Sequence, residues 1–198
     1  MYSVLERVIA IFILIVFMPV IALLIGCLIF DSGPIFYRQQ RVGKGGKAIY
    51  IYKFRSMVVG SDRLLKEYLG NDPVAAAEWA IRQKLRDDPR VTRLGRFIRK
   101  YSLDELPQLI SVLKGDMSLV GPRPVGPGEL LRYGASRRHY LRVRPGLTGV
   151  WQVMRTDQTT YSRRVAYDRA YVANANVCWD IKIIAMTVLR VLAPRGAH

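Results

Sequence analysis

Histidine and cysteine are scarce in this chain of 198 residues, which contains two of each. Because the histidines are His139 and His198, a histidine-based zinc site or catalytic triad has little material to work with. Cys27 and Cys178 lie far apart, and their spacing matches neither a disulfide framework nor a zinc motif. Carboxylates must therefore carry any role as acid, base or nucleophile.

Acidic residues are also outnumbered, since 15 Asp and Glu face 31 Lys and Arg, a formal net charge of +16. Residues 1–30 carry only Glu6 and Arg7, so the excess falls on residues 31–198. We expect one compact domain over 31–198 with an attachment at 1–30. A domain this basic attracts an anionic partner: nucleic acid, the headgroups of a membrane leaflet or a phosphorylated substrate.

Residues 8–30 form an uncharged apolar run, at least as long as the roughly 20 residues that a helix needs to cross a bilayer. The run fits a spanning helix, a cleaved export signal or a helix that returns to the same face. Signal peptides have a basic leader and an apolar run of about 7–15 residues, so this longer run disfavours cleavage. Pro19 predicts a kink, which permits a re-entrant helix, although a kinked spanning helix is the simpler interpretation of the residues alone. Basic residues follow the run and predict a cytoplasmic domain: Arg38, Arg41, Lys44 and Lys47.

Two β-like runs at 34–41 and 47–54 flank a glycine-rich turn at 42–46, which indicates a β-hairpin. The turn lacks the Lys and Ser or Thr that end a phosphate-binding P-loop. A hairpin turn is therefore the better interpretation of these glycines.

Apolar periodicity predicts helices at 61–69 and at 73–85, the second opened by Asp72 as its cap. A third helix is predicted at 181–192. This last helix is too short to span a bilayer, so we expect it in the core or in the membrane interface.

The acidic pair Asp104–Glu105 opens a helix whose apolar residues recur at helical spacing up to Gly115, which can end it. Ser102 and Glu105 fit a capping box, whereas Pro107 would suit the first helical turn if the helix began slightly later. Acidic residues in a first turn stabilise a helix by about 0.3–1 kcal/mol without further purpose, so the pair alone is weak support for function. Adjacent helical residues point about 100° apart, so one carboxylate could attack while the other holds a metal.

Phosphoryl transfer needs an oxygen nucleophile, a divalent cation and Arg or Lys groups that neutralise phosphate oxygens. An aspartate can serve as nucleophile by forming an acyl phosphate. The prolines around Arg123 fix a guanidinium that could bind phosphate, although an exposed turn arginine explains the same residues. Residues 144–152 predict a turn that leads into a β-like run.

Several of these motifs, in one order along nearly the whole chain, resemble the monotopic phosphoglycosyl transferases, bacterial sugar transferases that start glycan assembly on undecaprenyl phosphate. The motifs are KFRSM at 53–57, DPR at 88–90, GRF at 95–97, SLDELPQ at 102–108, KGDMS at 114–118, GPRP at 121–124 and RPGLTG at 144–149.

The resemblance implies an α+β, mainly helical fold, anchored as a monotopic protein on the cytoplasmic face of the bacterial inner membrane. Residues 1–30 would form a re-entrant membrane helix and 31–198 the cytoplasmic catalytic domain, with a β-hairpin and interfacial amphipathic helices. In this family the helix breaks at a proline that often follows serine. Here Met18 precedes Pro19, a departure from that pattern.

The resemblance also implies a two-step reaction. Asp104 would attack the sugar-bearing phosphorus of a UDP-sugar, UMP would leave, and undecaprenyl phosphate would then take the phosphosugar. Glu105 would bind Mg²⁺, Arg99 and Arg123 would hold phosphate groups, and Lys53 would lie near the site.

The chain is similar to the short members that act on hexoses in exopolysaccharide synthesis. The expected partners are a UDP-sugar, undecaprenyl phosphate and the lipid bilayer, without nucleic acid, and a homodimer is left open. The alternative, motivated by the charge alone, is a membrane-tethered protein that binds nucleic acid or acidic lipid.

Overall fold

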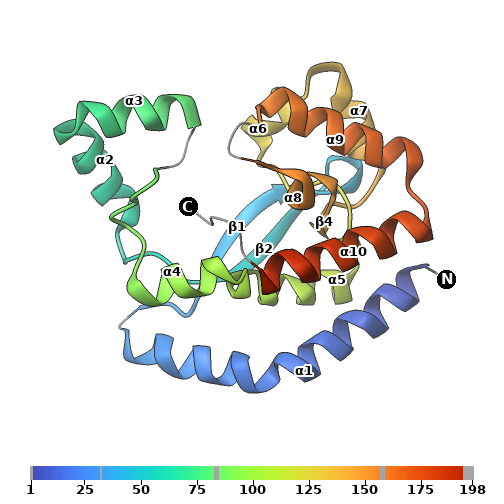
Figure 1. The fold of residues 1–198 in the computed structure, drawn as a ribbon, viewed down its shortest axis with the longest axis horizontal. Coiled ribbons are helices and arrows are strands. Elements are labelled where there is room, and N and C mark those ends of the chain that lie inside the picture. The colour runs from blue at the N-terminus through green and yellow to red at the C-terminus, as the bar shows by residue number, and fades with distance from the viewer. Residues whose placement is uncertain (1, 32, 83–84, 157–158, 194–198) are drawn as a thin grey trace.

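The computed structural model describes residues 2–31, 33–82, 85–156 and 159–193, and within them it confirms the α+β, mainly helical class (Figure 1). In chain order the main elements are α1 (Tyr2–Phe30), β1 (Phe36–Val42), β2 (Ala48–Phe54), α2 (Ser61–Asn71), α3 (Pro73–Arg82), α4 (Arg93–Lys100), the 3₁₀ helix η2 (Leu103–Gln108), α5 (Leu109–Lys114), β3 (Ser118–Val120), α6 (Pro127–Leu131), α7 (Arg137–Arg142), β4 (Gly146–Thr148), α8 (Val150–Met154), α9 (Tyr161–Asn174) and α10 (Val177–Leu192). Two single-turn 3₁₀ helices, η1 (Lys44–Gly46) and η3 (Gly134–Ser136), complete the set.

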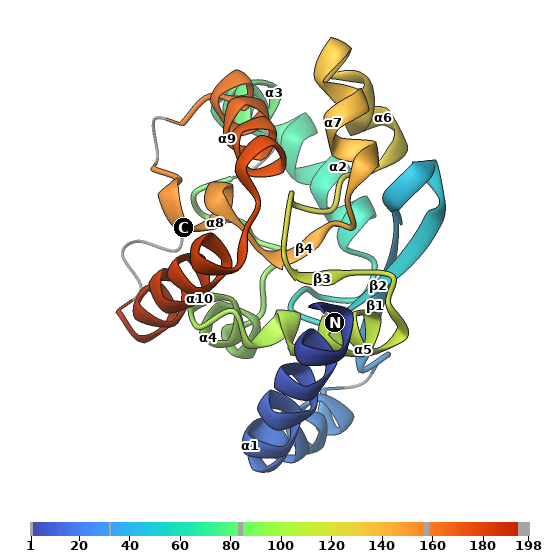
Figure 2. The same ribbon diagram turned by 90° about the vertical axis from the view of Figure 1, so that its right-hand side faces the viewer.

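The elements lie in layers that both ribbon views show (Figures 1 and 2). Helix α1 forms one outer layer, and α4, α5 and α10 lie next to it. The four strands occupy the middle, and α6, α7 and α9 lie on the side away from α1. Helices α2 and α3 project as a separate arm beyond α4.

Helix α1 is long and apolar enough to cross a membrane over Ser3–Phe30, judged by length and composition. Pro19 lies inside it, and the ribbon of α1 is visibly bent (Figure 1). Most of its large apolar side chains are exposed, while Ala10, Leu24 and Leu28 are buried against the rest of the protein. The apolar helix predicted from residues 8–30 is therefore confirmed, and it packs along the domain.

Both ends of α1 are bonded to that domain. Near its start, Glu6 accepts hydrogen bonds from the Leu119 backbone N–H (3.0 Å) and from Arg144 Nη2 (2.8 Å). At its other end, Arg55 Nη2 donates to the Leu28 carbonyl (3.4 Å) and forms an ion pair with Asp31 (3.2 Å). The two ends of one helix are thus held by the same globular body.

The predicted β-hairpin is confirmed: β1 and β2 pair antiparallel from Phe36↔Phe54 to Val42↔Ala48. The glycine-rich segment makes the turn between them, where Gly45 and Gly46 adopt positive φ. The helices predicted at 61–69 and 181–192 are present within α2 and α10. The helix predicted at 73–85 is present as α3, which ends at Arg82, and Leu85 is not helical. Asp72 caps α3 by accepting from the Val74 and Ala75 N–H groups, while residues 83–84 lie outside the described part of the chain.

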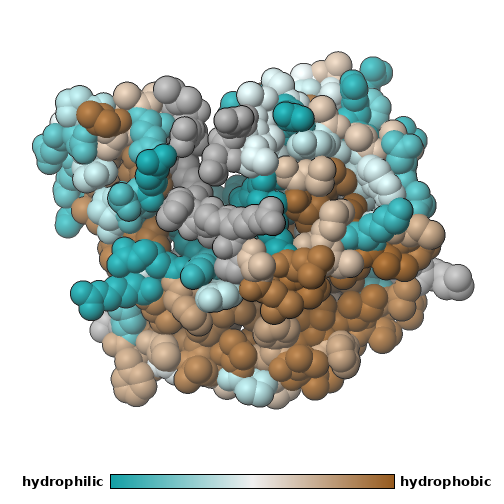
Figure 3. Space-filling model, viewed as in Figure 1, coloured by the Kyte–Doolittle hydropathy of each residue, from teal (hydrophilic) through white to brown (hydrophobic). Residues whose placement is uncertain are grey.

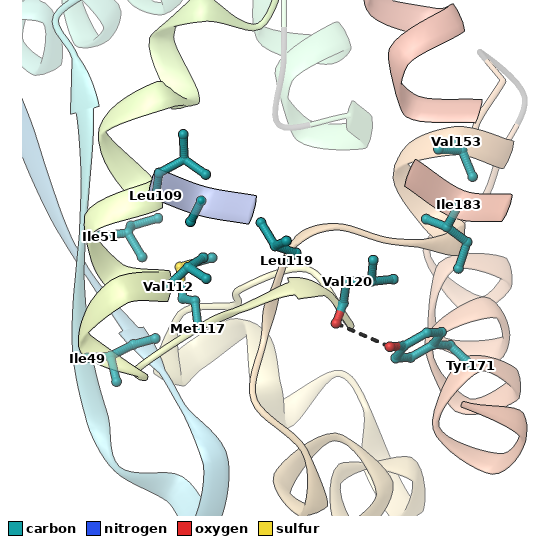
Figure 4. Close-up of a cluster of buried hydrophobic side chains, with 11 residues drawn as sticks. Ile49, Ile51, Leu109, Val112, Met117, Leu119, Val120, Val153, Tyr171 and Ile183 are labelled. Atoms are coloured by element: carbon teal, nitrogen blue, oxygen red, sulfur yellow. Dashed lines mark hydrogen bonds between the residues drawn. The ribbon is translucent and has the colours of Figure 1, made fainter. Parts of the chain in front are cut away.

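The largest hydrophobic core joins segments that are far apart in sequence (Figure 4). Ile49 and Ile51 of β2 pack against α5, and Leu119 and Val120 of β3 continue the cluster towards α8, α9 and α10. The Tyr171 hydroxyl donates to the Val120 carbonyl (3.2 Å), which ties α9 to β3. This core fixes the hairpin relative to α5, and η2 continues directly into α5.

A second sheet consists of the parallel pair β3 and β4. Gly121 and Gly146 lie so close that a Cβ on Gly146 would be 2.1 Å from the Gly121 nitrogen, so only glycine fits there. The contact brings the GPRP and RPGLTG segments side by side. The β-like run predicted up to Gln152 is wrong beyond Thr148, because α8 begins at Val150.

The capping box predicted at Ser102 and Glu105 is also wrong. The Ser102 side chain makes no capping hydrogen bond, and Ser102 has φ 54°, whereas an N-cap residue normally has extended backbone. The chain turns here through η2, a 3₁₀ helix that contains Pro107, before α5 begins at Leu109. Gly115 ends α5 in a left-handed conformation (φ 82°), as predicted.

Candidate active site

Asp104 and Glu105 lie in η2, a helix with three residues per turn. Residues three apart share a face of such a helix, so Glu105 is aligned with Gln108 and Asp104 with Pro107. The Asp104 residue is only 8% exposed. Among the described residues Ser102 is the only non-glycine with positive φ, and it stands immediately before this pair. The two carboxylates therefore face different surroundings, as expected from the sequence.

Lys53 near the end of β2 faces the acidic pair. Its Nζ lies 2.6 Å from Glu105 Oε1 and 3.9 Å from Asp104 Oδ2. The next residue, Phe54, points to the opposite side of the strand and is fully buried, which holds β2 in place. The structure thus brings Lys53 into the site that the sequence predicted.

Arg123 approaches the same carboxylate from the loop after β3, with Nη1 4.0 Å from Glu105 Oε1. The loop is held by Val125, whose N–H donates to the Tyr140 hydroxyl (3.2 Å). That hydroxyl in turn donates to the Val42 carbonyl (2.7 Å) at the end of β1. Glu105 therefore has two cations beside it from two separate segments.

Arg99 lies on α4, and its Nε donates to Ser56 Oγ (2.8 Å). Burial raises the pKa of Asp104, and the charge of Arg99 opposes that rise. Burial lowers the pKa of Arg99 itself, while the charges of Asp104 and Asp88 oppose that effect. A Cβ on Gly95 would be 1.9 Å from the Ser56 carbonyl oxygen, so glycine in GRF allows α4 to pack directly on this segment. Arg99 is thus positioned on the Asp104 side of the site.

The pKa values of the two acids move in opposite directions. Burial raises the pKa of Asp104 to about 6, because it outweighs the attraction of Lys53 and Arg99 and adds to the repulsion by Glu105. Burial also acts on Glu105, but there the charges of Lys53 and Arg123 win and lower its pKa. At neutral pH both carboxylates are therefore ionised, but the charge of Asp104 is less stabilised than that of Glu105.

A small pocket opens beside Glu105. Its polar groups come from five segments of the chain: Arg41, Lys53, Glu105, Gln108, Arg123 and Gln152. Burial lowers the pKa of Arg41, and the positive charge of Arg123 lowers it further. Two guanidinium groups that repel each other at one pocket favour an anionic ligand between them.

Sequence reasoning did not select Arg41, Gln108 or Gln152 as site residues. Gln108 was within the SLDELPQ motif, and the 3₁₀ spacing from Glu105 was the signal that could have selected it. No comparable signal existed for Arg41 or Gln152, because the hairpin and the β3–β4 contact bring them to the pocket only in the folded chain.

A metal site made by protein groups alone is not present, because no three His, Cys, Asp or Glu residues cluster within the described residues. Mg²⁺ is usually held by one or two carboxylates together with water and substrate phosphates. Glu105, with its lowered pKa, fits that smaller requirement. The donor set therefore suits a metal that arrives with a phosphorylated substrate.

A buried carboxylate, a second acid able to hold Mg²⁺ and flanking Lys and Arg groups are the parts of a phosphoryl-transfer site. The comparison with known proteins agrees, since residues 1–194 match the bacterial sugar transferase family. The chain belongs to that family. This confirms the resemblance to bacterial sugar transferases that the motifs indicate.

The chain is similar to several proteins whose names state a function. The chain is 54% identical over 168 residues to the undecaprenyl-phosphate galactose phosphotransferase of Salmonella typhimurium. The matched residues cover 85% of this chain and 35% of that protein. It is 44% identical over 191 residues to the exopolysaccharide production protein ExoY of Sinorhizobium fredii, covering 96% of this chain and 84% of that protein. With the UDP-galactose-lipid carrier transferase of Erwinia amylovora it shares 48% identity over 181 residues, covering 91% and 38%. The chain thus spans about a third of the length of the first and third of these relatives.

Proposed function

We propose that this protein transfers a sugar-1-phosphate, from a hexose, from a UDP-sugar to undecaprenyl phosphate and releases UMP. The relatives support the substrates: their names include undecaprenyl phosphate, UDP-galactose and UDP-glucose. The ExoY relative supports a place in exopolysaccharide production. Family membership also favours this enzyme over a protein that only binds nucleic acid or acidic lipid.

The observation that carries the proposal is the unequal treatment of two adjacent carboxylates. Asp104 is buried and its pKa is raised, so its ionised oxygen is poorly solvated and reactive towards an electrophilic phosphorus. Glu105 is held ionised by Lys53 at 2.6 Å and by Arg123. A nucleophile and a metal ligand need those two different environments.

In the first step Asp104 attacks the sugar-bearing phosphorus. An aspartyl phosphate bond forms, the bond to the UMP oxygen breaks, and UMP leaves with that electron pair. In the second step an oxygen of undecaprenyl phosphate attacks the same phosphorus, and the aspartate leaves as a free carboxylate. Lys53, Arg99 and Arg123 neutralise phosphate charge during both steps.

Glu105 would hold Mg²⁺ together with the diphosphate of the donor. When bound, the cation supplies charge neutralisation at the diphosphate and favours departure of UMP. The remaining tasks belong to the protein: Arg123 orients phosphate oxygens, and Lys53 keeps Glu105 ionised until the donor arrives.

The test is UMP release by the full chain in lipid nanodiscs, with UDP-galactose or UDP-glucose, Mg²⁺ and undecaprenyl phosphate. With the acceptor omitted and the sugar radiolabelled, we expect label on the protein that hydroxylamine removes, as it does from acyl phosphates. Label on Asp104→Asn protein, or acceptor-dependent turnover without any protein-bound label in a rapid quench, would refute the covalent intermediate.

We further propose that α1 enters and leaves the bilayer on one face, so that the catalytic domain lies on the cytoplasmic side of the inner membrane. The bonds of Glu6 and of Arg55 support this, since both ends of α1 contact one globular body. A straight helix of this length would carry Glu6 roughly 35 Å from Asp31 and across the hydrocarbon core. The bend and Pro19 agree with a re-entrant path.

The exposed apolar surface supports the same orientation. In the space-filling view, hydrophobic side chains of α1 and α10 form one continuous area on the lower part of the molecule (Figure 3). On α10 the exposed apolar residues include Ile181, Leu189 and Leu192. An area of this kind favours contact with lipid, with α10 lying in the interface.

Topology is tested by a cysteine at Ser3 in a background in which Cys27 and Cys178 are replaced. Membrane-impermeant maleimide should label it only after the inner membrane is opened. Labelling in intact spheroplasts would instead establish a spanning helix. A homodimer stays a prediction, which the mass of the protein in nanodiscs would test.

A further inference from the structure

Two glutamine amides at the pocket beside Glu105 have buried polar atoms without a partner. Gln108 is 3% exposed, and its Nε2 donor has no hydrogen-bond partner in the structure. Gln152 lines the same pocket, and its buried Oε1 acceptor is also unpartnered. A buried polar atom without a partner destabilises the protein, and most such atoms in folded proteins are hydrogen-bonded, so these two indicate a missing partner.

The chain places both amides by close backbone contacts. Gln108 follows Glu105 by one turn of η2, so the two residues lie on the same face of that helix. Gln152 is on the first turn of α8, and this helix begins immediately after Gly149. A Cβ on Gly149 would lie 2.1 Å from the Gly121 carbonyl oxygen and 3.0 Å from Gln152 Oε1. Glycine at 149 thus leaves the room in which the Gln152 amide lies.

The rest of the pocket lining combines charged, neutral polar and apolar side chains. Lys53, Arg41 and Arg123 supply positive charge suited to a diphosphate. The other walls include the apolar side chains of Ile51 and Leu147. A ligand group that enters this small pocket therefore meets both the cations and the two neutral amides.

The unpartnered atoms restrict which ligand group can pair with both amides. One of them is a donor and the other an acceptor, and an ionised phosphate oxygen can only accept. It could pair with Gln108 but not with Gln152. A hydroxyl group accepts from Nε2 and donates to Oε1, so hydroxyls of a sugar satisfy both amides.

We propose that Gln108 and Gln152 bind hydroxyl groups of the donor's hexose and determine which sugar is accepted. The inference rests on the proposed function and deepens it. Sites built to bond a hydroxyl reject analogues that lack it, because their own polar groups are then left unpaired. The amides therefore contribute to selectivity rather than to the phosphoryl chemistry.

The experiment measures kcat/KM for UMP release with UDP-galactose, UDP-glucose and the series of UDP-sugars that each lack one hydroxyl. For wild type, kcat/KM should be about tenfold or more lower with at least one deoxy donor than with the parent sugar. With the parent sugar, kcat/KM of the Gln108→Met and Gln152→Met variants should be lower than that of wild type by a similar factor. Replacing the parent sugar by that deoxy donor should lower kcat/KM of the variants little further. The substitution and the missing hydroxyl would then remove the same interaction.

Two controls accompany the series. Gln40→Met changes an exposed glutamine on β1 and should leave the ratio of parent to deoxy donor as in wild type. Inhibition by UMP should change less than twofold in the Gln108 and Gln152 variants, because UMP lacks the hexose. A loss of UMP inhibition equal to the loss of donor activity would mean that the amides bind the nucleotide, which overturns the proposal.

The outcomes separate this inference from the proposed function. Suppose that wild type releases UMP and that kcat/KM falls by less than about threefold for every deoxy donor. Hydroxyl recognition is then refuted, and this result does not depend on whether the variants fold. If the ratio of kcat/KM for the parent donor to kcat/KM for the deoxy donor is the same in wild type and in folded variants, the role assigned to Gln108 and Gln152 is refuted. If no UDP-sugar yields UMP, the proposed function fails, and this inference fails with it.

Discussion

Two buried aspartates in this protein share one electrostatic property and differ in their neighbours. Burial is the largest effect on both Asp104 and Asp168, and it raises the pKa of each to about 6. Asp104 lies in η2 beside Glu105 and Lys53. Asp168 lies on α9, on the side of the molecule away from α1 (Figures 1 and 2). A raised pKa therefore does not by itself distinguish a catalytic acid.

The neighbours of Asp168 bond within the cluster. Asp168 accepts from the Tyr133 hydroxyl (2.7 Å), and Arg164 on the same helix pairs with Glu129 (2.6 Å). The Arg164 guanidinium also lies 5.4 Å from the centre of the Tyr161 ring. These contacts join α6 and Tyr133, which follows α6, to α9, so the cluster holds these segments together.

The neighbours of Asp104 lead to a pocket. Glu105 is adjacent, Lys53 contacts both acids, and Arg123 and the unpartnered amides follow along the same wall. The comparison shows what distinguishes the two buried acids. The groups around Asp168 bond to one another, whereas groups around Asp104 line a pocket where they can bind a ligand. Four experiments test this distinction, from the largest expected effect to the smallest.

Asp104→Asn should reduce UMP release by about 10³-fold or more, because an amide cannot form the acyl phosphate. Asp168→Asn is the matched variant, since it removes the other buried carboxylate with the same pKa direction. It should keep activity within about tenfold of wild type. UMP release and thermal unfolding are measured for both, and equal losses of activity would remove the distinction between the two acids.

Lys53→Met should lower kcat/KM by about 10²-fold, because it removes a cation that keeps Glu105 ionised and neutralises phosphate. Lys47→Met, on the same hairpin, breaks an exposed ion pair with Asp116 (3.3 Å) and should change activity less than twofold. Steady-state kinetics at pH 7.5, about neutral, measure both variants. An equal effect of the two would show that only general charge matters.

The pH dependence of kcat/KM reports the free enzyme. Because the pKa of Asp104 is raised to about 6, the nucleophile is protonated below that pH and ionised above it. Activity should therefore rise about tenfold per pH unit below pH 6 and level off above it. Asp168→Asn should leave the midpoint unchanged, so a midpoint that moves with this substitution would contradict the assignment to Asp104.

Tyr133→Phe should produce the smallest effect. It removes the hydroxyl that Asp168 accepts from, which should lower the free energy of unfolding by about 1–2 kcal/mol and Tm by a few degrees. Activity at a temperature well below Tm should stay within twofold. A selective loss of kcat with unchanged Tm would place the Asp168 cluster in the reaction.

Much of the site was predictable because neighbouring residues in sequence carry it. The adjacency of Asp104 and Glu105 guarantees that they lie together, and the prolines around Arg123 fix that residue locally. The hairpin followed from its glycine-rich turn. The capping box failed because Ser102 has positive φ, a backbone conformation that residue pattern did not indicate.

By itself, the sequence determined the apolar helix, the hairpin and the acidic pair, because each depends on residues that are close together in the chain. It also determined the basic charge of the domain and the family, because composition and the order of motifs need no knowledge of the fold. Only the tertiary structure decided that Lys53 faces Glu105, that Gln108 and Gln152 share one pocket and that both ends of α1 return to one body. Those relations depend on the parallel pairing of β3 with β4 and on the core between β2 and α5. Long-range packing of this kind joins segments whose local patterns contain no information about one another.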